Sequence, residues 1–266
     1  MSHDQVTIQT RDGKCPAHVM TPAEAGSWPA AIFYGDAGGI RPAVLDMAQQ
    51  LANAGYLVLL PDLFYRYGPY KALVPKEVFA GDVMAILGPL MATTGNDKAA
   101  QDTDAFIAYL DSRGDVAGSK LGAVGFCMGG GMALTAAATY PDRFAAVASF
   151  HGGNLATDQP TSPHLLAPRL KAEVYVAGAD NDDSYPPAMA QRLQKALAEA
   201  GVNHSAEIYA GAAHGWMVPD FPSYDPASAT RGWTAMLALF MRNLNGQGSH
   251  ELPFAAGDKT RPSALK

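Results

Sequence analysis

Cysteine is scarce in this sequence, and its basic residues form no cluster. Cys15 and Cys127 are the two cysteines among 266 residues, so no disulfide framework is indicated. Acidic residues outnumber basic ones by 25 to 19, and the net charge is −6. An acidic chain without a Lys/Arg-rich stretch is poorly suited to nucleic acid or an anionic membrane surface, and neither partner is expected.

Long apolar runs and cofactor motifs are also lacking. No run of about eighteen apolar residues is present, so no membrane-spanning segment is expected. The first ten residues, MSHDQVTIQT, include neither the basic nor the apolar region of a secretory signal, and a cytoplasmic location is expected. The HExxH spacing, the Walker lysine and the G-x-G-x-x-G pattern are absent. We therefore expect neither a metal nor a nucleotide cofactor.

Short apolar strands alternate with amphipathic helices along most of the chain. The expected strands cover residues 6–10, 17–20, 30–34, 56–60, 121–124, 144–150, 173–177 and 205–209, and the expected helices cover 41–54, 97–112, 132–138, 189–200 and 226–243. The first two strands flank Asp12-Gly13 and predict a hairpin. The alternation predicts an α/β fold with a mostly parallel central sheet and helices on both faces.

Two regions depart from this regular alternation. Between residues 68 and 95 the pattern is weak. Residues 78–90 are expected to be helical with a break at Gly88-Pro89, as part of a cap or a mobile flank. We expect a single domain over residues 1–244, followed by a polar tail over 245–266 that is poorly ordered or exchanged with a neighbour. A monomer or a homodimer is expected.

The most informative stretch runs from Leu121 to Tyr140 and reads LGAVGFCMGGGMALTAAATY. An apolar strand leads into Gly125-Phe126-Cys127-Met128-Gly129, and an Ala-rich helix follows, as in a nucleophile elbow. Glycines suit such a turn because a Cβ at Gly125 or Gly129 would crowd it. The N-terminus of the following helix favours a thiolate at Cys127. The alternative is a buried structural cysteine beside a packing turn.

A nucleophile of this kind needs a base, and His214 is the leading candidate. It lies in Gly211-Ala212-Ala213-His214-Gly215-Trp216, a loop that follows the last expected strand. The order nucleophile, acid, histidine matches that of α/β-hydrolases. His151 also follows a strand, but no acid at a strand end lies between it and Cys127.

The acid that orients the histidine is expected in the loop Gly178-Ala179-Asp180-Asn181-Asp182-Asp183. We favour Asp182, which lies four residues before Pro186. Asp180 and Asp183 remain open, and at least two of the three carboxylates are expected to be solvated.

With these motifs the sequence resembles the dienelactone hydrolase family of α/β-hydrolases. Gly125-Phe126-Cys127-Met128-Gly129-Gly130 is similar to the family's cysteine elbow. Further similarities are Gly55-Tyr56 followed by Pro61-Asp62-Leu63, the loop around Asp182, and His214-Gly215 followed by an aromatic residue. The resemblance implies a Cys127-Asp182-His214 triad that opens enol lactones or related esters through an acyl-enzyme. It also implies an oxyanion hole made by the backbone N–H groups of Ala37 and Met128.

The sequence departs from that family at two places. Asp36 stands where the family's lactonases place a Glu that pairs with the resting thiol, so it either reaches Cys127 or serves as a turn residue. Shortly after the histidine, where the family has an arginine for the substrate carboxylate, residues 215–220 contain no basic residue. Arg66 is a candidate substitute, and otherwise the substrate lacks that carboxylate. Tyr65 and Trp216 are expected to line the pocket.

The sequence therefore predicts a cofactor-independent cysteine hydrolase that acts on a small ester or lactone. One alternative is a carboxylesterase of broad specificity with the same triad. The other is a binding or redox-sensing relative in which Cys127 no longer supports hydrolysis.

Overall fold

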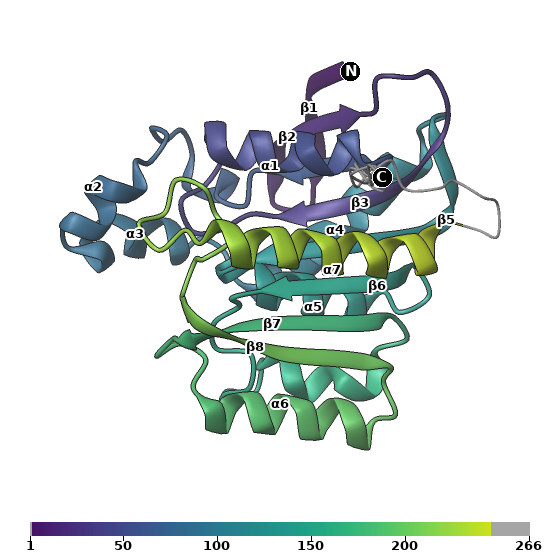
Figure 1. Cartoon of the computed structure of the whole chain (residues 1–266). Helices are drawn as coiled ribbons and strands as arrows, with labels where there is room; N and C mark the ends of the chain where they lie inside the picture. The colour runs from purple at the N-terminus through teal and green to yellow at the C-terminus, as the bar shows by residue number, and fades with distance from the viewer. Residues whose placement is uncertain (1, 246–266) are drawn as a thin grey trace, which may run out of the picture.

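The computed structural model describes residues 2–245 (Figure 1). Its strands are β1 (Ser2–Thr10), β2 (Gly13–Thr21), β3 (Trp28–Tyr34), β4 (Leu57–Pro61), β5 (Val116–Phe126), β6 (Phe144–Phe150), β7 (Glu173–Asn181) and β8 (His204–Ala213). Its α-helices are α1 (Pro42–Asn53), α2 (Pro75–Ala80), α3 (Val83–Met91), α4 (Asn96–Asp111), α5 (Met128–Thr139), α6 (Pro187–Glu199) and α7 (Pro226–Leu244). Two 3₁₀ turns cover Tyr65–Tyr67 and Pro163–Arg169. The expected tail over 245–266 lies almost wholly outside the described residues.

All eight strands form one sheet in the order β1-β2-β4-β3-β5-β6-β7-β8. The hairpin β1–β2 is antiparallel and joins β4 in antiparallel register, whereas the pairs from β4 through β8 are parallel. The prediction of a mostly parallel sheet is therefore confirmed. Because the carboxyl ends of parallel strands meet at one edge, the loops that follow β3, β5, β7 and β8 are brought together there.

Helices cover both faces of the sheet, as the alternating pattern predicts. One apolar layer packs side chains of α1 and α7, such as Leu51 and Phe240, against the strands. The other layer packs α4, α5 and α6 against the opposite face, with Phe106, Leu134 and Leu197 among its members. The central strands are apolar on both sides for this reason. In Figure 1, α2 and α3 lie apart from these layers, beyond the carboxyl ends of the strands.

The weak region between residues 68 and 95 contains two helices, and the expected position of its break is wrong. The chain breaks at Gly81, where α2 ends, and Asp82 caps α3 by accepting a hydrogen bond from the Ala85 N–H at 3.0 Å. The cap sets the start of α3. The helix then continues through Gly88 and Pro89 and ends two residues later, so the proline disturbs only its final turn.

Candidate active site

Cys127 lies at the sharp turn between β5 and α5, as the glycine pattern predicts. Its backbone has φ 53° and ψ −117°, a conformation that costs energy for a residue with a Cβ. The turn is tight because a Cβ on Gly125 would overlap the carbonyl group of Gly129, and one on Gly129 would overlap the carbonyl of Tyr34. The strand–turn–helix geometry raises the thiol above the end of the sheet.

The thiol, one histidine and one aspartate form a continuous line of contacts. The distance from His214 Nε2 to Cys127 Sγ is 3.0 Å. The distance from His214 Nδ1 to Asp182 Oδ2 is 2.7 Å. The carboxylate of Asp182 is buried and the imidazole is partly exposed. These three residues lie 55 and 32 positions apart along the chain but follow β5, β7 and β8 at the same edge of the sheet.

Among the three candidate aspartates, Asp182 contacts the histidine. Asp180 is exposed and accepts a hydrogen bond from the Gly211 N–H at 3.1 Å. Asp183 is exposed as well. The preference for Asp182 over its neighbours therefore agrees with the geometry.

Two serines that the sequence reasoning missed hold this arrangement in place. Ser184 donates from its hydroxyl to Asp182 Oδ1 at 2.5 Å and from its backbone N–H to the same oxygen at 2.9 Å. Ser223 donates to the carbonyl oxygen of His214 at 2.6 Å. The spacing Asp-x-Ser is typical of an Asx turn, and this was the available signal for Ser184.

Electrostatics favour the charged forms of the histidine and the aspartate. Burial alone lowers the pKa of His214, but its hydrogen bonds to Asp182 and Cys127, with their charges, raise that pKa to about 10. Burial likewise opposes ionisation of Asp182, but hydrogen bonds from His214 and Ser184 lower its pKa below the usual value. The site thus stabilises an imidazolium beside a carboxylate at neutral pH.

His151, the competing histidine, lies beside His214 and is not one of the three residues in the Cys127–His214–Asp182 contacts. Its ring is fully buried, and its Nδ1 accepts a hydrogen bond from the Cys127 backbone N–H at 3.2 Å. The ring centroids of His151 and His214 are 5.5 Å apart. Burial, followed by the nearby charge of His214, lowers the pKa of His151 well below its usual value. It is a neutral ring that packs against the site and contacts Cys127 through the backbone.

The two residues expected to form the oxyanion hole follow β3 and β5 at the same edge of the sheet. Met128 is the first residue of α5, where a backbone N–H has no acceptor within its own helix. Ala37 lies in the loop after β3 and lines the same cavity as Cys127 and His214. Met128 also packs against the small apolar cluster that contains Ala37.

Asp36 does not pair with the thiol. Its Oδ1 accepts hydrogen bonds from the Gly38 N–H at 2.7 Å and from Arg41 Nη1 at 2.8 Å, and its Oδ2 accepts from Arg41 Nη2 at 3.1 Å. With one methylene fewer than a Glu, this buried carboxylate is held by its own loop. Of the two roles considered for Asp36, the turn role is the one that these contacts fit.

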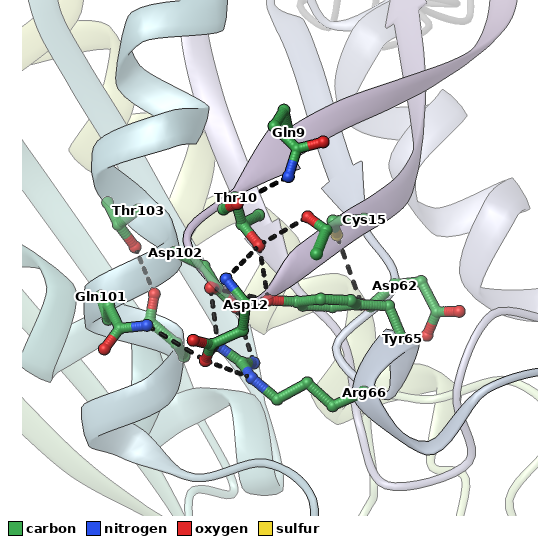
Figure 2. A network of polar contacts seen from close by, with 12 residues as sticks. Gln9, Thr10, Asp12, Cys15, Asp62, Tyr65, Arg66, Gln101, Asp102 and Thr103 are labelled. Atoms are coloured by element: carbon green, nitrogen blue, oxygen red, sulfur yellow. Dashed lines mark hydrogen bonds and ion pairs between the residues drawn. The ribbon is translucent and has the colours of Figure 1, made fainter.

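Arg66 and Tyr65, considered for contacts with the substrate, do not line the cavity that contains Cys127 and His214. Figure 2 shows them in a separate polar network, where Arg66 binds both oxygens of Asp102 and also Asp12. The Tyr65 hydroxyl contacts Thr10 at 2.7 Å and donates to Asp102 at 3.0 Å. Cys15, the second cysteine, is fully buried at the edge of this network, and burial raises the pKa of its thiol.

Trp216 does not line the pocket either. Its side chain is fully buried, its ring stacks on Tyr209, and it meets His151 and Phe150 edge-on. Trp216 is therefore a core residue that supports the loop carrying His214.

A cavity of about 210 Å³ opens at the thiol. Cys127, His214, Ala37 and Phe221 form its floor and one side, and the other walls come from α2, α3 and the residues just before them. The cap expected from the weak region is therefore present above the thiol. Over residues 2–245, no group of three or more His, Cys, Asp or Glu side chains is arranged to hold a metal ion.

The sheet order, the elbow and the residues at the strand ends define the α/β-hydrolase class. The sequence model of the dienelactone hydrolase family matches residues 15–244. A protein from Methylorubrum extorquens named "Putative carboxymethylenebutenolidase" is 29% identical over 240 residues, which cover 89% of this chain and 79% of that protein. A protein of the same name from Salmonella typhi is 29% identical over 237 residues, or 88% of this chain and 85% of that one.

Solved structures agree with the sequence comparison. A structure described as "Putative Dienelactone Hydrolase" from Klebsiella pneumoniae superposes with a TM-score of 0.80 at 25% identity, covering 91% of this chain and 98% of that one. The chain belongs to the dienelactone hydrolase family. It is a hydrolase that acts on carboxylic ester bonds. None of the helices in the part of the chain described is both long and apolar enough to cross a bilayer.

Proposed function

We propose that the enzyme cleaves small esters or lactones through a covalent thioester on Cys127. The observation that carries this proposal is the unbroken line from Cys127 Sγ to His214 Nε2 at 3.0 Å and from His214 Nδ1 to Asp182 at 2.7 Å. A nucleophile within hydrogen-bond reach of a base, and a base oriented by a carboxylate, are the requirements of nucleophilic catalysis.

In the acylation half-reaction, the thiol proton moves to His214 Nε2, which leaves a thiolate beside an imidazolium. The thiolate attacks the carbonyl carbon, and the carbonyl oxygen becomes an oxyanion that accepts hydrogen bonds from the N–H groups of Ala37 and Met128. Each such donor contributes on the order of 10²–10³ to the rate. The C–O bond then breaks, and the leaving oxygen takes the proton from His214 Nε2. In a lactone the alcohol stays tethered to the acyl group.

In the second half-reaction, neutral His214 takes a proton from water as the water attacks the thioester carbonyl. A second oxyanion forms in the same hole and collapses, which releases the carboxylic acid and returns the thiolate–imidazolium pair. Asp182 accepts the Nδ1–H bond throughout and stabilises the charged imidazole. The cycle uses only the substrate, water, the side chains of Cys127, Asp182 and His214, and the two backbone N–H groups.

The test is a mass measurement on rapidly quenched enzyme. The protein is mixed with a panel of aryl esters and enol lactones, quenched in acid within milliseconds, and its intact mass is determined. An acyl adduct that maps to Cys127 by peptide digestion supports the proposal, and the panel separates a lactonase from a carboxylesterase of broad specificity. Turnover without any adduct, and with undiminished activity in Cys127→Ala, would contradict it.

A further inference from the structure

The cavity above Cys127 is apolar on every wall that the catalytic residues do not form. Its side chains from the cap and the flanking loop include Leu73, Val78, Phe79, Val83, Leu87 and Phe221. Phe79 and Phe221 meet edge-on with their centroids 5.2 Å apart. Phe79 is 46% exposed, so the rim of the cavity is apolar as well as its interior. A substrate group that enters here leaves water for an apolar surface.

Among the described residues that line this cavity there is no Lys or Arg, and His214 beside the thiol is the one basic side chain. Arg41 lies next to one wall, with its guanidinium carbon 5.4 Å from the Phe221 ring centroid. Its side chain is 1% exposed, and it is already bound to both Asp36 and Asp220. Arg66 is bound to Asp102 and Asp12 in the network of Figure 2. An anionic group among the apolar side chains of the cap, away from His214, would lose hydration without gaining a charged partner.

The size of the cavity limits the length of the apolar group. Its volume of about 210 Å³ is below the range of pockets for drug-sized ligands, about 300–1,000 Å³. The space fits a short aliphatic chain or one small ring.

We propose that the substrate is an uncharged ester or lactone with a short apolar group next to the scissile carbonyl. This inference rests on the proposed function, because it assigns the occupant of the same site. It selects neutral aliphatic acyl or alkoxy groups and rejects substrates that carry a carboxylate on that group.

The first experiment varies chain length and charge separately. One series of esters keeps an aryl leaving group and lengthens the acyl chain from acetyl to octanoyl, and a second keeps an acetyl group and lengthens the alcohol. In the series whose variable chain enters the cavity, kcat/KM is expected to rise about threefold to fourfold per methylene and then to level off when the cavity is full. The matched ester with a terminal carboxylate is expected to be about 100-fold poorer than its neutral counterpart.

The second experiment adds a charge inside the cavity. Val83→Arg replaces a half-buried lining residue on α3, and it should raise the anionic-to-neutral ratio of kcat/KM at least tenfold. Met84→Arg is the matched control, because Met84 is the next residue on the same helix, is 67% exposed and does not line the cavity. It adds the same charge to the protein and should leave the ratio unchanged.

The outcomes separate this inference from the proposed function. Hydrolysis of aryl acetate through a Cys127 adduct, with no chain-length dependence in either series or with a preference for the anionic ester, overturns the inference and leaves the mechanism standing. An equal change of ratio in Val83→Arg and Met84→Arg also overturns it, since the effect would then come from net charge. Absence of a Cys127 adduct with the acetate overturns the proposed function itself.

Discussion

Arg41 binds Asp220 across 179 residues of sequence, with Nε 2.7 Å from Oδ2 and Nη2 2.8 Å from Oδ1. The same guanidinium pairs with both oxygens of Asp36 and is almost fully buried. Asp36 precedes Ala37 in the loop after β3, and Asp220 follows His214 in the loop after β8. One side chain therefore joins the loop of the expected oxyanion hole to the loop of the histidine.

Replacing this arginine should weaken catalysis more than binding. In Arg41→Met, Asp36 is left buried without its cation, and stability should fall by about 3–5 kcal/mol. Because the two loops are no longer fixed to each other, we expect kcat to fall about 10- to 100-fold while KM changes little. Steady-state kinetics and thermal unfolding on the same preparation measure both effects.

Arg66→Met is the matched control for that variant. Arg66 also pairs with two carboxylates, but its network lies away from Cys127. It should lower the free energy of unfolding and leave kcat close to that of the wild type. Equal losses of kcat in the two variants would show that Arg41 acts only through general stability.

The two aspartates of the β7 loop should differ sharply. Asp182→Asn places an amide against His214 Nδ1, disfavours the productive tautomer and is expected to lower kcat by about 10³–10⁴. Asp180→Asn keeps an oxygen that can accept the hydrogen bond from the Gly211 N–H, and its kcat should stay within about twofold of the wild type. An Asp180→Asn enzyme as inactive as Asp182→Asn would reject the assignment of the orienting acid.

The nucleophile should not tolerate exchange of sulfur for oxygen. Cys127→Ala and His214→Ala are expected to abolish burst formation of the acyl-enzyme. Cys127→Ser should retain at most about 1% of activity, because a site arranged around a thiol nucleophile activates a hydroxyl poorly. Stopped-flow release of the aryl alcohol measures this directly, and wild-type burst rates from the serine enzyme would count against a thiolate mechanism.

The dependence of kcat/KM on pH should follow the ionisation of His214. The pKa of His214 is raised to about 10, so the imidazolium that protonates the leaving group persists through neutral pH and is lost as pH rises through that value. The kcat/KM for an ester with a poor leaving group should therefore fall near pH 10. Asp182→Asn removes a hydrogen bond that raises this pKa, and its residual activity should fall at lower pH. If the activity of both enzymes fell at the same pH, the loss would be due to a group other than His214.

Most of the fold was predictable because its signals are local. Buried parallel strands such as β6 are continuous apolar runs, and the observed bounds of that strand match the expected ones. The elbow could be predicted because close backbone contacts require glycine at two positions. Gly125 lies against the backbone of Gly129, four residues away, and Gly129 lies against the backbone of Tyr34 on the neighbouring strand. The choice of Asp182 depended on loop position, a weaker signal that here agrees with the contact to His214.

The features that were missed depend on pairings between distant segments. Nothing near Arg41 in the sequence indicates that it binds Asp220, since the contact exists only once β8 has paired with β7 and the loop after β8 lies at the same edge of the sheet. Arg66 was considered a substitute for the basic residue missing from 215–220, and nothing in the sequence indicates that Asp102 on α4 is its partner. The boundary between the two cap helices was hard to predict because α2 has only six residues and α3 is apolar along its whole length, so periodicity gave no boundary.

The burial of Cys15 has a practical consequence. The chain has two thiols, and one of them has no exposed surface and a raised pKa, which makes it inert to alkylating reagents while the protein is folded. Cys127 is partly exposed at the cavity. The unmodified enzyme thus behaves as a single-thiol protein, so one equivalent of a maleimide or iodoacetamide dye counts competent active sites in any preparation. The same reaction attaches a spectroscopic reporter beneath the cap without any engineered cysteine.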